Sequence, residues 1–599
     1  MADPSGTDRP SGFDRETALR RLAGEEFDLL VVGGGVTGCG VALDAAARGL
    51  RTALVEAADF ASGTSSRSSK LIHGGLRYLQ QHDYRLVYEA LAERQRLLRN
   101  AAHLVHPLPF LIPLFGKDGV VSEGLAKAYS TALWLYDITG GWRIGKRHRR
   151  IDQRTVLEHL PDLRVDHLVA GFLYWDAQAD DARLTLALAR TAALGFDAAV
   201  ANYCPVASLV EDAEGRVRGA LLADGTVVRA RVVVDAGGVW AEEIAKLGIG
   251  ADPGISIRPA KGIHLTVPAA RLPCDFASVL SVPGDRRSIF VVPWDAAAGP
   301  SSLEGAEGRF VYLGTTDTDY EGPLDEPVCT PDDVDYILRT VNAWTSAGLT
   351  AADVTGSWAG LRPLIRGGDG HSRRRSRRQT ARTADLSRRH RVMRSPSGLV
   401  TVTGGKLTTY RRMAADTVDE VVRSIASESR PRGRRFPSSP TKRLPLWGAG
   451  SPDAGLAAST GHPRSNGHPG SNGLPAETLG HLQRRYGSEA AVVASLVDDD
   501  PSLAEPLVPG LPYVKAEAVF AARHEMVVSL ADVLSRRTRA LILDAEACAS
   551  AADDVARLVG AELGWTEARR RQGVDDFVAM VHEHRRAAGL PTAAVSTPR

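Results

Sequence analysis

The feature that most constrains this chain is the segment Phe27 to Glu56, FDLLVVGGGVTGCGVALDAAARGLRTALVE. An apolar run enters a glycine turn, a helix of small residues follows, and a second apolar run ends in an acid. Gly33 permits a sharp turn, Gly35 lets the backbone approach a pyrophosphate, and Gly38 lets the helix pack tightly on the sheet. This order predicts a βαβ unit that binds a dinucleotide.

The two ends of this unit predict how the ligand lies. The helix expected to begin near Val36 directs its unpaired N–H groups and the positive end of its dipole at the phosphates. Glu56 stands at the end of the second strand, where its carboxylate can accept hydrogen bonds from both hydroxyls of an adenosine ribose and would repel the 2′-phosphate of NADP. The motif alone does not distinguish FAD from NAD.

Three later segments extend the expected site. Arg231 to Ala241 predicts a strand that returns through two glycines to the dinucleotide, and such distant completion favours FAD over a compact NAD module. Ala57 to Gln80 is dense in Ser, Thr and Gly directly after the ribose acid, so we expect it to face the cofactor rather than solvent. In Leu399 to Val422 a strand, the glycine pair Gly404-Gly405 and a helix offer a second set of backbone N–H groups.

Composition limits the class of protein. A chain of 599 residues with 44 % hydrophobic and 24 % charged residues is an ordinary globular sequence that is too long for one core. The N-terminus lacks the apolar segment of a signal peptide, and no run of 18 apolar residues occurs, so we expect a cytoplasmic protein. Five cysteines without CxxC spacing indicate neither a disulfide framework nor a metal site.

We expect an α/β fold with α+β character, in which a FAD domain of the two-dinucleotide-binding type is combined with an antiparallel-sheet substrate domain and a C-terminal helical domain. Strand-like runs between Ile255 and Tyr320 predict the antiparallel sheet, and apolar residues at helical spacing predict the last domain. The expected divisions are a polar tail that ends in a short amphipathic helix (1–26), the interleaved FAD and substrate domains (27–430), a low-complexity linker (431–475) and the helical domain (476–599).

Two charged clusters are open to more than one interpretation. The segment Arg366 to Arg394 holds eleven arginines against two aspartates, a local charge of +9. A nucleic-acid patch is the alternative, but no aromatic residues are interleaved, so we expect a basic loop that contributes to a small phosphate site and no nucleic-acid partner. The helix expected at Leu125 to Ile138, followed by the basic run Gly140 to Arg150, suits either an anionic membrane surface or a buried aromatic helix with a solvated turn.

Seven motifs in fixed order carry a resemblance to a known family: VVGGGVTGCG (31–40), TSSRSSKLIHGGLRYL (64–79), YWDAQADDARL (174–184), AKGIHLTV (260–267), GTTDTDYEG (314–322), AGLRPL (359–364) and GGKLTTYR (404–411). On these motifs the chain resembles FAD-dependent aerobic glycerol-3-phosphate dehydrogenases of the bacterial respiratory type, within the D-amino-acid-oxidase-like flavoprotein superfamily. It departs from the pattern in its histidine- and serine-rich linker and in the extra arginines of the 366–394 loop.

The resemblance implies oxidation of sn-glycerol 3-phosphate to dihydroxyacetone phosphate, with electrons passing from reduced FAD to a membrane quinone. An oxidase of the same family, which uses oxygen and makes hydrogen peroxide, is the alternative. The chemistry needs a base beside the flavin and cations for the phosphate. His73 is the first candidate for the base and His264 the second, while Arg362 would polarise the developing ketone.

The remaining expected residues are of two kinds. The substrate clamp comprises Arg77, Tyr78, Arg388, Lys406 and Thr409. The cofactor site comprises Gly33, Gly34, Gly35, Gly38, Glu56, Thr64, Ser65, Ser66, Lys70, Leu71, His73, Gly237, Gly405, Lys406 and Leu407. On the membrane interpretation of the 125–150 region, peripheral attachment to the cytoplasmic face of the inner membrane would be a further partner contact besides substrate and quinone. The sequence leaves the oligomeric state open, a homodimer being one option.

Overall fold

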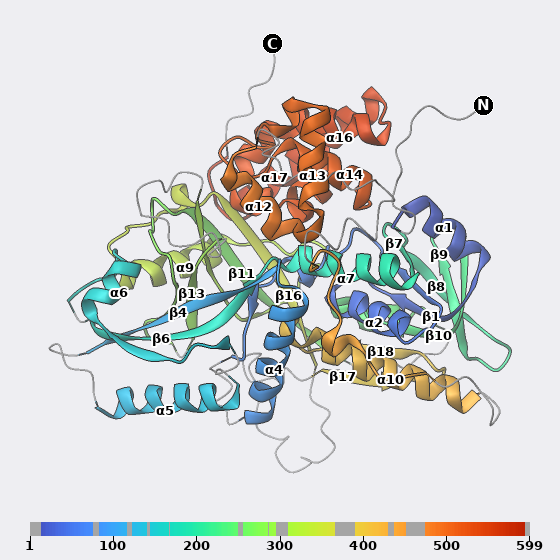
Figure 1. Ribbon diagram of the computed structural model, residues 1–599, viewed down its shortest axis with the longest axis horizontal. Coiled ribbons are helices and arrows are strands. Elements are labelled where there is room, and N and C mark those ends of the chain that lie inside the picture. Colours follow the sequence, from blue (N-terminus) through green and yellow to red (C-terminus); the bar gives the residue numbers. More distant parts are fainter. Residues whose placement is uncertain are drawn as a thin grey trace, which may run out of the picture.

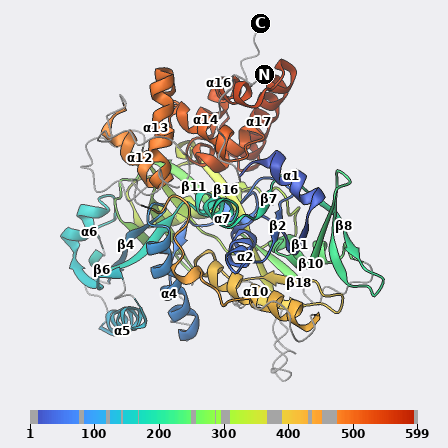
Figure 2. The same ribbon diagram turned by 45° about the vertical axis from the view of Figure 1, so that its right-hand side comes forward.

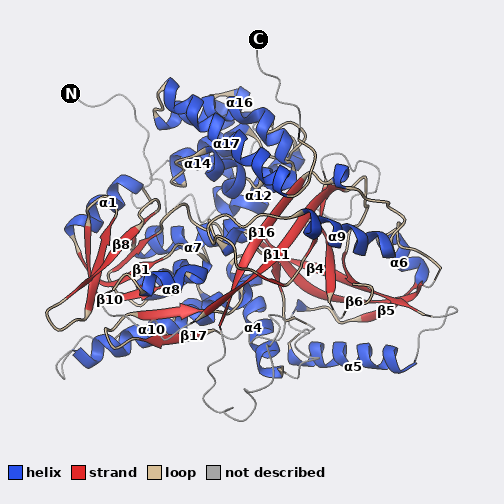
Figure 3. Ribbon diagram, turned by 180° about the vertical axis from the view of Figure 1, so that it is seen from behind, coloured by secondary structure: helices blue, strands red, loops and turns tan. Residues whose placement is uncertain are grey.

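The computed structural model describes residues 13–75, 83–116, 123–140, 144–166, 168–248, 256–285, 287–294, 309–365, 390–428, 436–450 and 474–592. Two sheets lie side by side, and the helices of the C-terminal region cover the junction between them (Figure 1). The same arrangement is seen from behind, with the strands of the two sheets on opposite sides of the molecule (Figure 3).

The first sheet has the order β17-β18-β10-β1-β2-β7, with the β8–β9 hairpin joined to β10. Strand β1 pairs in parallel with β2 on one side and with β10 on the other, so that Val32 lies beside both Val55 and Asp235. The predicted βαβ unit and the returning strand are therefore confirmed. The strands are β1 (Glu26–Val32), β2 (Thr52–Val55), β7 (Ala199–Ala201), β8 (Val206–Glu211), β9 (Val217–Leu222), β10 (Val227–Asp235), β17 (Arg391–Arg394) and β18 (Val400–Thr403).

Alternating side chains of β1 bury against different layers, as a strand with two covered faces requires. Leu29 and Val31 pack in a core built with α2 (Val36–Ala47), α7 (Asp181–Phe196) and α10 (Tyr410–Glu428). On the other face, Leu30 and Val32 pack with α1 (Arg15–Gly24) and the β8–β9 hairpin. Figure 2 shows α1 and α2 on the two sides of this sheet. The predicted amphipathic helix thus belongs to the folded sheet region, which begins before residue 26.

The second sheet has the order β15-β11-β14-β13-β12-β4-β6-β3, with β16 joined to β11 and β5 to β6. The predicted antiparallel pairing holds for β11, β13, β14 and β16, but β12 pairs in parallel with β4. Parallel pairing is possible because a long excursion of the chain separates these two strands. The strands are β3 (Leu71–Ile72), β4 (Val105–Phe115), β5 (Arg149–Asp152), β6 (Leu168–Ala179), β11 (Ile257–Pro268), β12 (Ala277–Ser281), β13 (Ser288–Pro293), β14 (Phe310–Gly314), β15 (Thr318–Asp319) and β16 (Gly356–Ile365).

Four helices flank this sheet, namely α4 (Tyr84–Asn100), α5 (Glu123–Thr139), α6 (Gln153–His159) and α9 (Pro331–Trp344), and α4 also contacts α10 through the Glu93–Arg411 ion pair. The short α8 (Ala241–Ala245) follows β10. The C-terminal domain is helical, as predicted, and has its own apolar cores. Its helices are α12 (Ala476–Tyr486), α13 (Ala490–Asp499), α14 (Lys515–His524), α15 (Ala540–Leu543), α16 (Ala545–Leu563) and α17 (Glu567–Ala587), and the π-helical turn η11 (Asp532–Arg537) lies among them. Among the helices that the structure describes, none is both long and apolar enough to cross a bilayer.

Candidate active site

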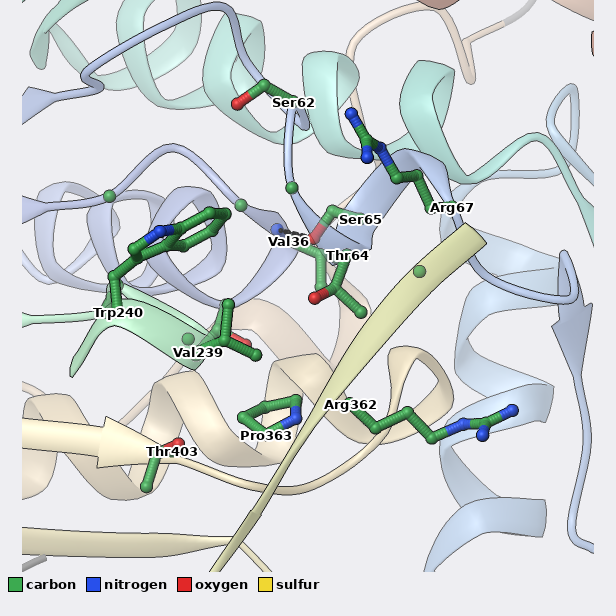
Figure 4. A pocket seen from close by; sticks show the side chains of 18 of the residues that line it. Val36, Ser62, Thr64, Ser65, Arg67, Val239, Trp240, Arg362, Pro363 and Thr403 are labelled. Carbon is green, nitrogen blue, oxygen red and sulfur yellow. Dashed lines mark hydrogen bonds between the residues drawn. The ribbon is translucent and has the colours of Figure 1, made fainter. Parts of the chain in front are cut away.

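A cavity of about 780 Å³ lies between the two sheets. Its walls come from the glycine turn after β1, the segment that follows β2, the end of β10, strand β16 and the turn between β18 and α10. In Figure 4, Val36, Thr64 and Ser65 lie between Trp240 on one side and Arg362 on the other. The volume falls in the range of cofactor and ligand sites, so one continuous space serves both the dinucleotide turn and the second sheet.

The glycine turn leaves no room for side chains. Gly33 has a φ of +112°, and a Cβ there would lie 2.8 Å from the carbonyl oxygen of Ala236. A Cβ on Gly38 would lie 1.9 Å from the carbonyl oxygen of Gly33, so α2 can pack this closely on the turn only with glycine at this position. Helix α2 begins at Val36, as expected, with its N-terminus at the cavity. The roles predicted for these glycines follow from this geometry.

Glu56 ends β2 beside the turn and lines the cavity. Its Oε2 accepts a hydrogen bond from the Gly34 N–H at 2.5 Å, and its Oε1 accepts one from the Ala58 N–H at 2.9 Å. Burial raises the pKa of this carboxyl, while the two backbone donors act in the opposite direction. Two fixed donors therefore orient the carboxylate at the place where a ribose hydroxyl pair is expected.

The Ser/Thr-rich segment after Glu56 forms one wall of the cavity. Ser65 accepts a hydrogen bond from the N–H of Val36 at 2.9 Å, and Thr64 donates to the Leu361 carbonyl at 2.6 Å, which joins the segment to β16. A Cβ on Gly360 would lie 2.6 Å from the Arg67 carbonyl oxygen, so the segment crosses β16 in close contact. The wall is thereby fixed to both halves of the cavity.

Arg362 projects from β16 and lines the cavity. Its guanidinium donates to Asp317 Oδ1 at 3.0 Å, to the Thr316 carbonyl at 3.2 Å and to Thr315 Oγ1 at 3.1 Å. A Cβ on Gly262 of the neighbouring strand β11 would lie 2.7 Å from this guanidinium. Glycine at that position therefore creates the space that the arginine occupies.

The two candidate bases occupy different environments. His73 follows β3 and donates its backbone N–H to Thr408 Oγ1 at 3.2 Å, so its position depends on the turn before α10. His264 lies in the middle of β11, where its Nε2 is 2.9 Å from Ser69 Oγ and its ring stacks on Trp358 with centroids 4.8 Å apart. Burial lowers the pKa of His264 well below its ordinary value, which keeps this imidazole neutral.

The structure brings most of the expected residues together at this cavity. Those that line it are Gly33, Gly35, Glu56, Thr64, Ser65, Leu71, His73, Gly237, His264, Arg362, Gly405, Lys406 and Leu407. Gly34 and Gly38 shape the turn from behind. Arg77, Tyr78 and Arg388 lie outside the described residues.

Three expected residues do not face the cavity. Thr409 is buried and donates its hydroxyl to the Lys406 carbonyl at 3.3 Å, so it stabilises the turn rather than presenting a donor to a ligand. Ser66 is buried, and its carbonyl accepts a hydrogen bond from Lys70 Nζ at 3.1 Å. Lys70 Nζ also pairs with Asp181 at 3.3 Å, and burial lowers the pKa of this lysine to about 8. The path of the segment 64–70 directs Ser66 and Lys70 away from the cavity, and the turn before α10 does the same for Thr409. The sequence alone did not indicate either orientation.

Other lining residues were missed at the sequence level. Trp240 lines the cavity in the short turn after β10, and its indole N–H donates to Asp325 Oδ1 at 3.0 Å in the loop between β15 and α9. Thr403, the last residue of β18, also lines it. The only sequence signal for Trp240 was its position two residues after the Gly237-Gly238 pair, which did not by itself indicate a contact with Asp325.

The residues present fit FAD. The turn offers a cradle that a Cβ at Gly33 or Gly38 would fill, a helix N-terminus and an oriented acid, all at one cavity. A family model described as "FAD dependent oxidoreductase" matches residues 28–411, and one described as "C-terminal domain of alpha-glycerophosphate oxidase" matches residues 439–570. The cofactor of this fold is FAD.

The chain is similar over most of its length to curated proteins. It is 40 % identical over 574 residues to "Glycerol-3-phosphate dehydrogenase 2" of Mycobacterium tuberculosis, covering 95 % of this chain and 90 % of that protein. It is 35 % identical over 602 residues to the mitochondrial glycerol-3-phosphate dehydrogenase of Rattus norvegicus, covering 96 % and 75 %.

A solved structure, the glycerol-3-phosphate dehydrogenase of Bacillus halodurans complexed with FAD, matches with a TM-score of 0.72 at 28 % identity, covering 97 % of this chain and 98 % of that one. Its agreement extends through both sheets and the helical domain. The glycine cradle and the oriented acid agree with these similarities. The chain therefore belongs to the FAD-dependent glycerol-3-phosphate dehydrogenase family of FAD-dependent oxidoreductases.

Proposed function

We propose that this enzyme oxidises sn-glycerol 3-phosphate to dihydroxyacetone phosphate and that the electrons then pass from the flavin to a membrane quinone. The observation that carries the proposal is that His73, His264, Arg362 and Lys406 line the same cavity as the dinucleotide turn. The relatives named glycerol-3-phosphate dehydrogenase support the choice of substrate.

The side chains suit the oxidation of a phosphorylated alcohol. FAD, when bound, supplies the acceptor for the two electrons removed from carbon 2. A base must take the hydroxyl proton, and we assign this role to His73, because the turn containing Thr408 fixes its backbone beside the cavity. His264 is the second candidate, but burial lowers the pKa of its imidazole well below the ordinary value, which makes it the weaker base of the two.

Cationic side chains suit the oxygen atoms of the substrate and product. Asp317, Thr315 and the Thr316 carbonyl hold the guanidinium of Arg362 in place, so that it can stabilise the developing ketone without reorganisation. Lys406 contributes a positive charge for the phosphate dianion at the same cavity. We assign Arg77, Tyr78 and Arg388 to the phosphate clamp as well, on the family resemblance of their motifs.

Anaerobic titration of the yellow holoprotein tests the substrate. We expect sn-glycerol 3-phosphate to bleach the oxidised flavin spectrum with one equivalent, and glycerol and inorganic phosphate, each added alone as controls, to leave it unchanged. Bleaching by an amino acid or another hydroxy acid, with none by sn-glycerol 3-phosphate, would refute the assignment.

The acceptor requires a separate measurement. The family model for the C-terminal domain takes its description from an oxidase, so oxygen is the alternative acceptor, with hydrogen peroxide as product. We expect fast reduction of a soluble quinone and a peroxide yield of only a few per cent of substrate consumed. Stoichiometric peroxide in air, with no competition by quinone, would instead identify an oxidase.

We further propose that the protein docks peripherally on an anionic membrane through α5. Trp134 is 51 % exposed and Ile138 67 % exposed on its outer face, and α5 lies on the side of the molecule away from the C-terminal domain (Figure 1). An exposed basic segment, Lys146–Arg150, which leads into β5, follows this helix. Apolar side chains beside basic ones suit insertion between acidic headgroups. This surface would bring the protein from the cytoplasm to its quinone.

Sedimentation with vesicles tests the docking. We expect binding to phosphatidylglycerol vesicles at low salt, weaker binding to neutral vesicles, and at least a five-fold loss of binding in the double variant Trp134→Ser, Ile138→Ser. The matched control is Arg154→Ser, an exposed residue on α6 that is paired with Glu158. Equal binding of the double variant and the wild type would remove α5 from the proposal.

A further inference from the structure

We propose that the C-terminal helical domain retains the cofactor, by fixing the segment 59–70 from behind with three arginines, Arg536, Arg537 and Arg539. This segment is the Ser/Thr-rich wall of the FAD cavity. The proposal concerns cofactor binding, so it goes beyond the oxidation of substrate and does not depend on which acceptor receives the electrons.

Asp59 is the first point of attachment. It is fully buried, and Arg537 binds it through two parallel hydrogen bonds, with NH1 2.6 Å from Oδ2 and NH2 2.9 Å from Oδ1. Arg536 donates its Nε to the same carboxylate at 2.6 Å. Burial alone would raise the pKa of Asp59, but the two guanidinium groups hold it below its usual range. The carboxylate therefore stays charged and clamped between two residues of the C-terminal domain.

Ser66 is the second point of attachment. Its carbonyl accepts hydrogen bonds from Arg539 NH2 and from Lys70 Nζ. Arg539 and Lys70 both lie 3.3 Å from Asp181, the first residue of α7, and Asp181 also accepts from the Ser68 N–H at 3.0 Å and from the Ser68 hydroxyl at 2.6 Å. One acid of the FAD domain and one arginine of the C-terminal domain thus hold the same turn.

The clamp lies on the reverse side of the wall. Asp59, Ser66 and Lys70 are buried and do not line the cavity, whereas Ser62, Thr64 and Ser65 line it. Figure 4 shows Ser62, Thr64 and Ser65 around the N-terminus of α2, with Ser65 bonded to Val36. Movement of the clamped groups, the Asp59 carboxylate and the Ser66 carbonyl, would therefore shift the hydroxyl groups of Ser62, Thr64 and Ser65 relative to the N-terminus of α2, which faces the dinucleotide.

The chemistry of the clamp favours a positioning role. A buried ion pair adds little net stability over a well-packed apolar contact, because removing two charges from water is costly. The planar guanidinium fork does fix orientation, since two parallel hydrogen bonds define both distance and angle, and lysine cannot reproduce them. We therefore expect Arg→Lys variants to loosen the wall while keeping the charge balance of the interface.

The experiment is a titration of deflavinated full-length protein with FAD, followed by flavin fluorescence, on the variants Arg537→Lys and Arg539→Lys. The matched control is Arg190→Lys. Arg190 is similarly buried at the same interface, where it binds Glu489 of the C-terminal domain at 2.5 and 2.8 Å. It lies 3.8 Å from Glu525, as Arg537 does, but among the described residues no hydrogen bond or ion pair joins it directly to the segment 59–70. We expect the FAD dissociation constant to rise about ten-fold in the first two variants and less than two-fold in the control.

Hydrogen exchange of the same proteins without FAD provides the second measurement and does not depend on activity. The amides of residues 59–70 should exchange at least five-fold faster in Arg539→Lys, whereas those of residues 40–47, which bond within α2, should not change. Where Arg537→Lys does not fold, Asp59→Asn, which keeps the volume and weakens the same contact, replaces it in the titration.

Unchanged FAD affinity in the clamp variants would overturn the proposal. An equal loss in Arg190→Lys would overturn it as well, because the effect would then come from domain docking in general. The Michaelis constant of the FAD-saturated variants for the substrate should stay within two-fold of the wild type, and a larger change would place these arginines at the substrate site instead.

Discussion

Asp235 provides a quantitative test of the electrostatics behind the cofactor turn. It is the last residue of β10, is fully buried, and accepts a hydrogen bond from the Gly237 N–H through Oδ1 at 2.9 Å. Burial raises its pKa to about 7, while Gly237 and the neighbouring Thr401 act weakly in the opposite direction. The perturbation we consider is Asp235→Asn, which keeps the acceptor for Gly237 and removes the ionisable group.

The sign and size of the effect follow from proton linkage. The folded pKa of about 7 lies above the ordinary value of 3.8 for an aspartate, so between these pH values the folded state holds a proton that the unfolded state has lost. Stability must then fall as pH rises, by about 1.4 kcal/mol per pH unit. Over the whole interval the loss is about 4 kcal/mol. Well above pH 7 Asp235 is ionised in both the folded and the unfolded state, so its contribution to the free energy of unfolding no longer changes with pH.

The assay is urea unfolding of wild type and Asp235→Asn, with excess FAD, at intervals from pH 5 to 8.5. We expect the variant to gain about 2.5 kcal/mol relative to the wild type between pH 5 and 7.5, with little further gain above pH 7.5. Asp224→Asn is the control, because this exposed turn residue has a lowered pKa and does not titrate in the same window. Parallel pH profiles for Asp235→Asn and the wild type would refute the reasoning.

Three further predictions concern the site. His73→Ala should lower kcat by about 10² to 10⁴ and change FAD affinity by less than three-fold, since general bases contribute on this scale; a near-normal kcat would exclude this histidine as the base. Arg362→Lys should lower kcat/KM by about 10-fold to 100-fold through loss of the guanidinium fork; steady-state assays with saturating FAD check this, and an unchanged value would show that the arginine does not contact the reacting group. Gly38→Ala should yield folded protein without bound flavin, because its Cβ would lie 1.9 Å from the Gly33 carbonyl oxygen; absorbance at 450 nm with a circular dichroism spectrum distinguishes the cases, and retained yellow colour would contradict the prediction.

The dinucleotide end of the site was predictable because its determinants are local. The glycine spacing, the small-residue helix and the terminal acid all lie between Phe27 and Glu56, and the structure forms β1, α2 and β2 from them. The return of β10 was also predictable, since a strand followed by two glycines has few other places in such a sheet.

Which side chains point into the cavity could not be predicted from local sequence in the same way. Lys70 and Ser66 belong to the cofactor motif in sequence, yet the Lys70 side chain turns to Asp181 and Ser66 is buried with its carbonyl bonded to Arg539, because of the path that the segment takes across β16. Thr409 likewise stabilises its own turn. A shift of one position in an extended segment exchanges the two faces, and only packing decides which face is buried.

By itself, the sequence determined that a dinucleotide lies on the first βαβ unit, that a second sheet covers it and that a helical domain follows. Tertiary structure decided that Gly262 makes room for Arg362, that Trp240 reaches Asp325, and that arginines near residue 537 hold a carboxylate at residue 59. These contacts join residues separated by up to several hundred positions, and they depend on strand register and domain docking, which no local pattern of residues encodes.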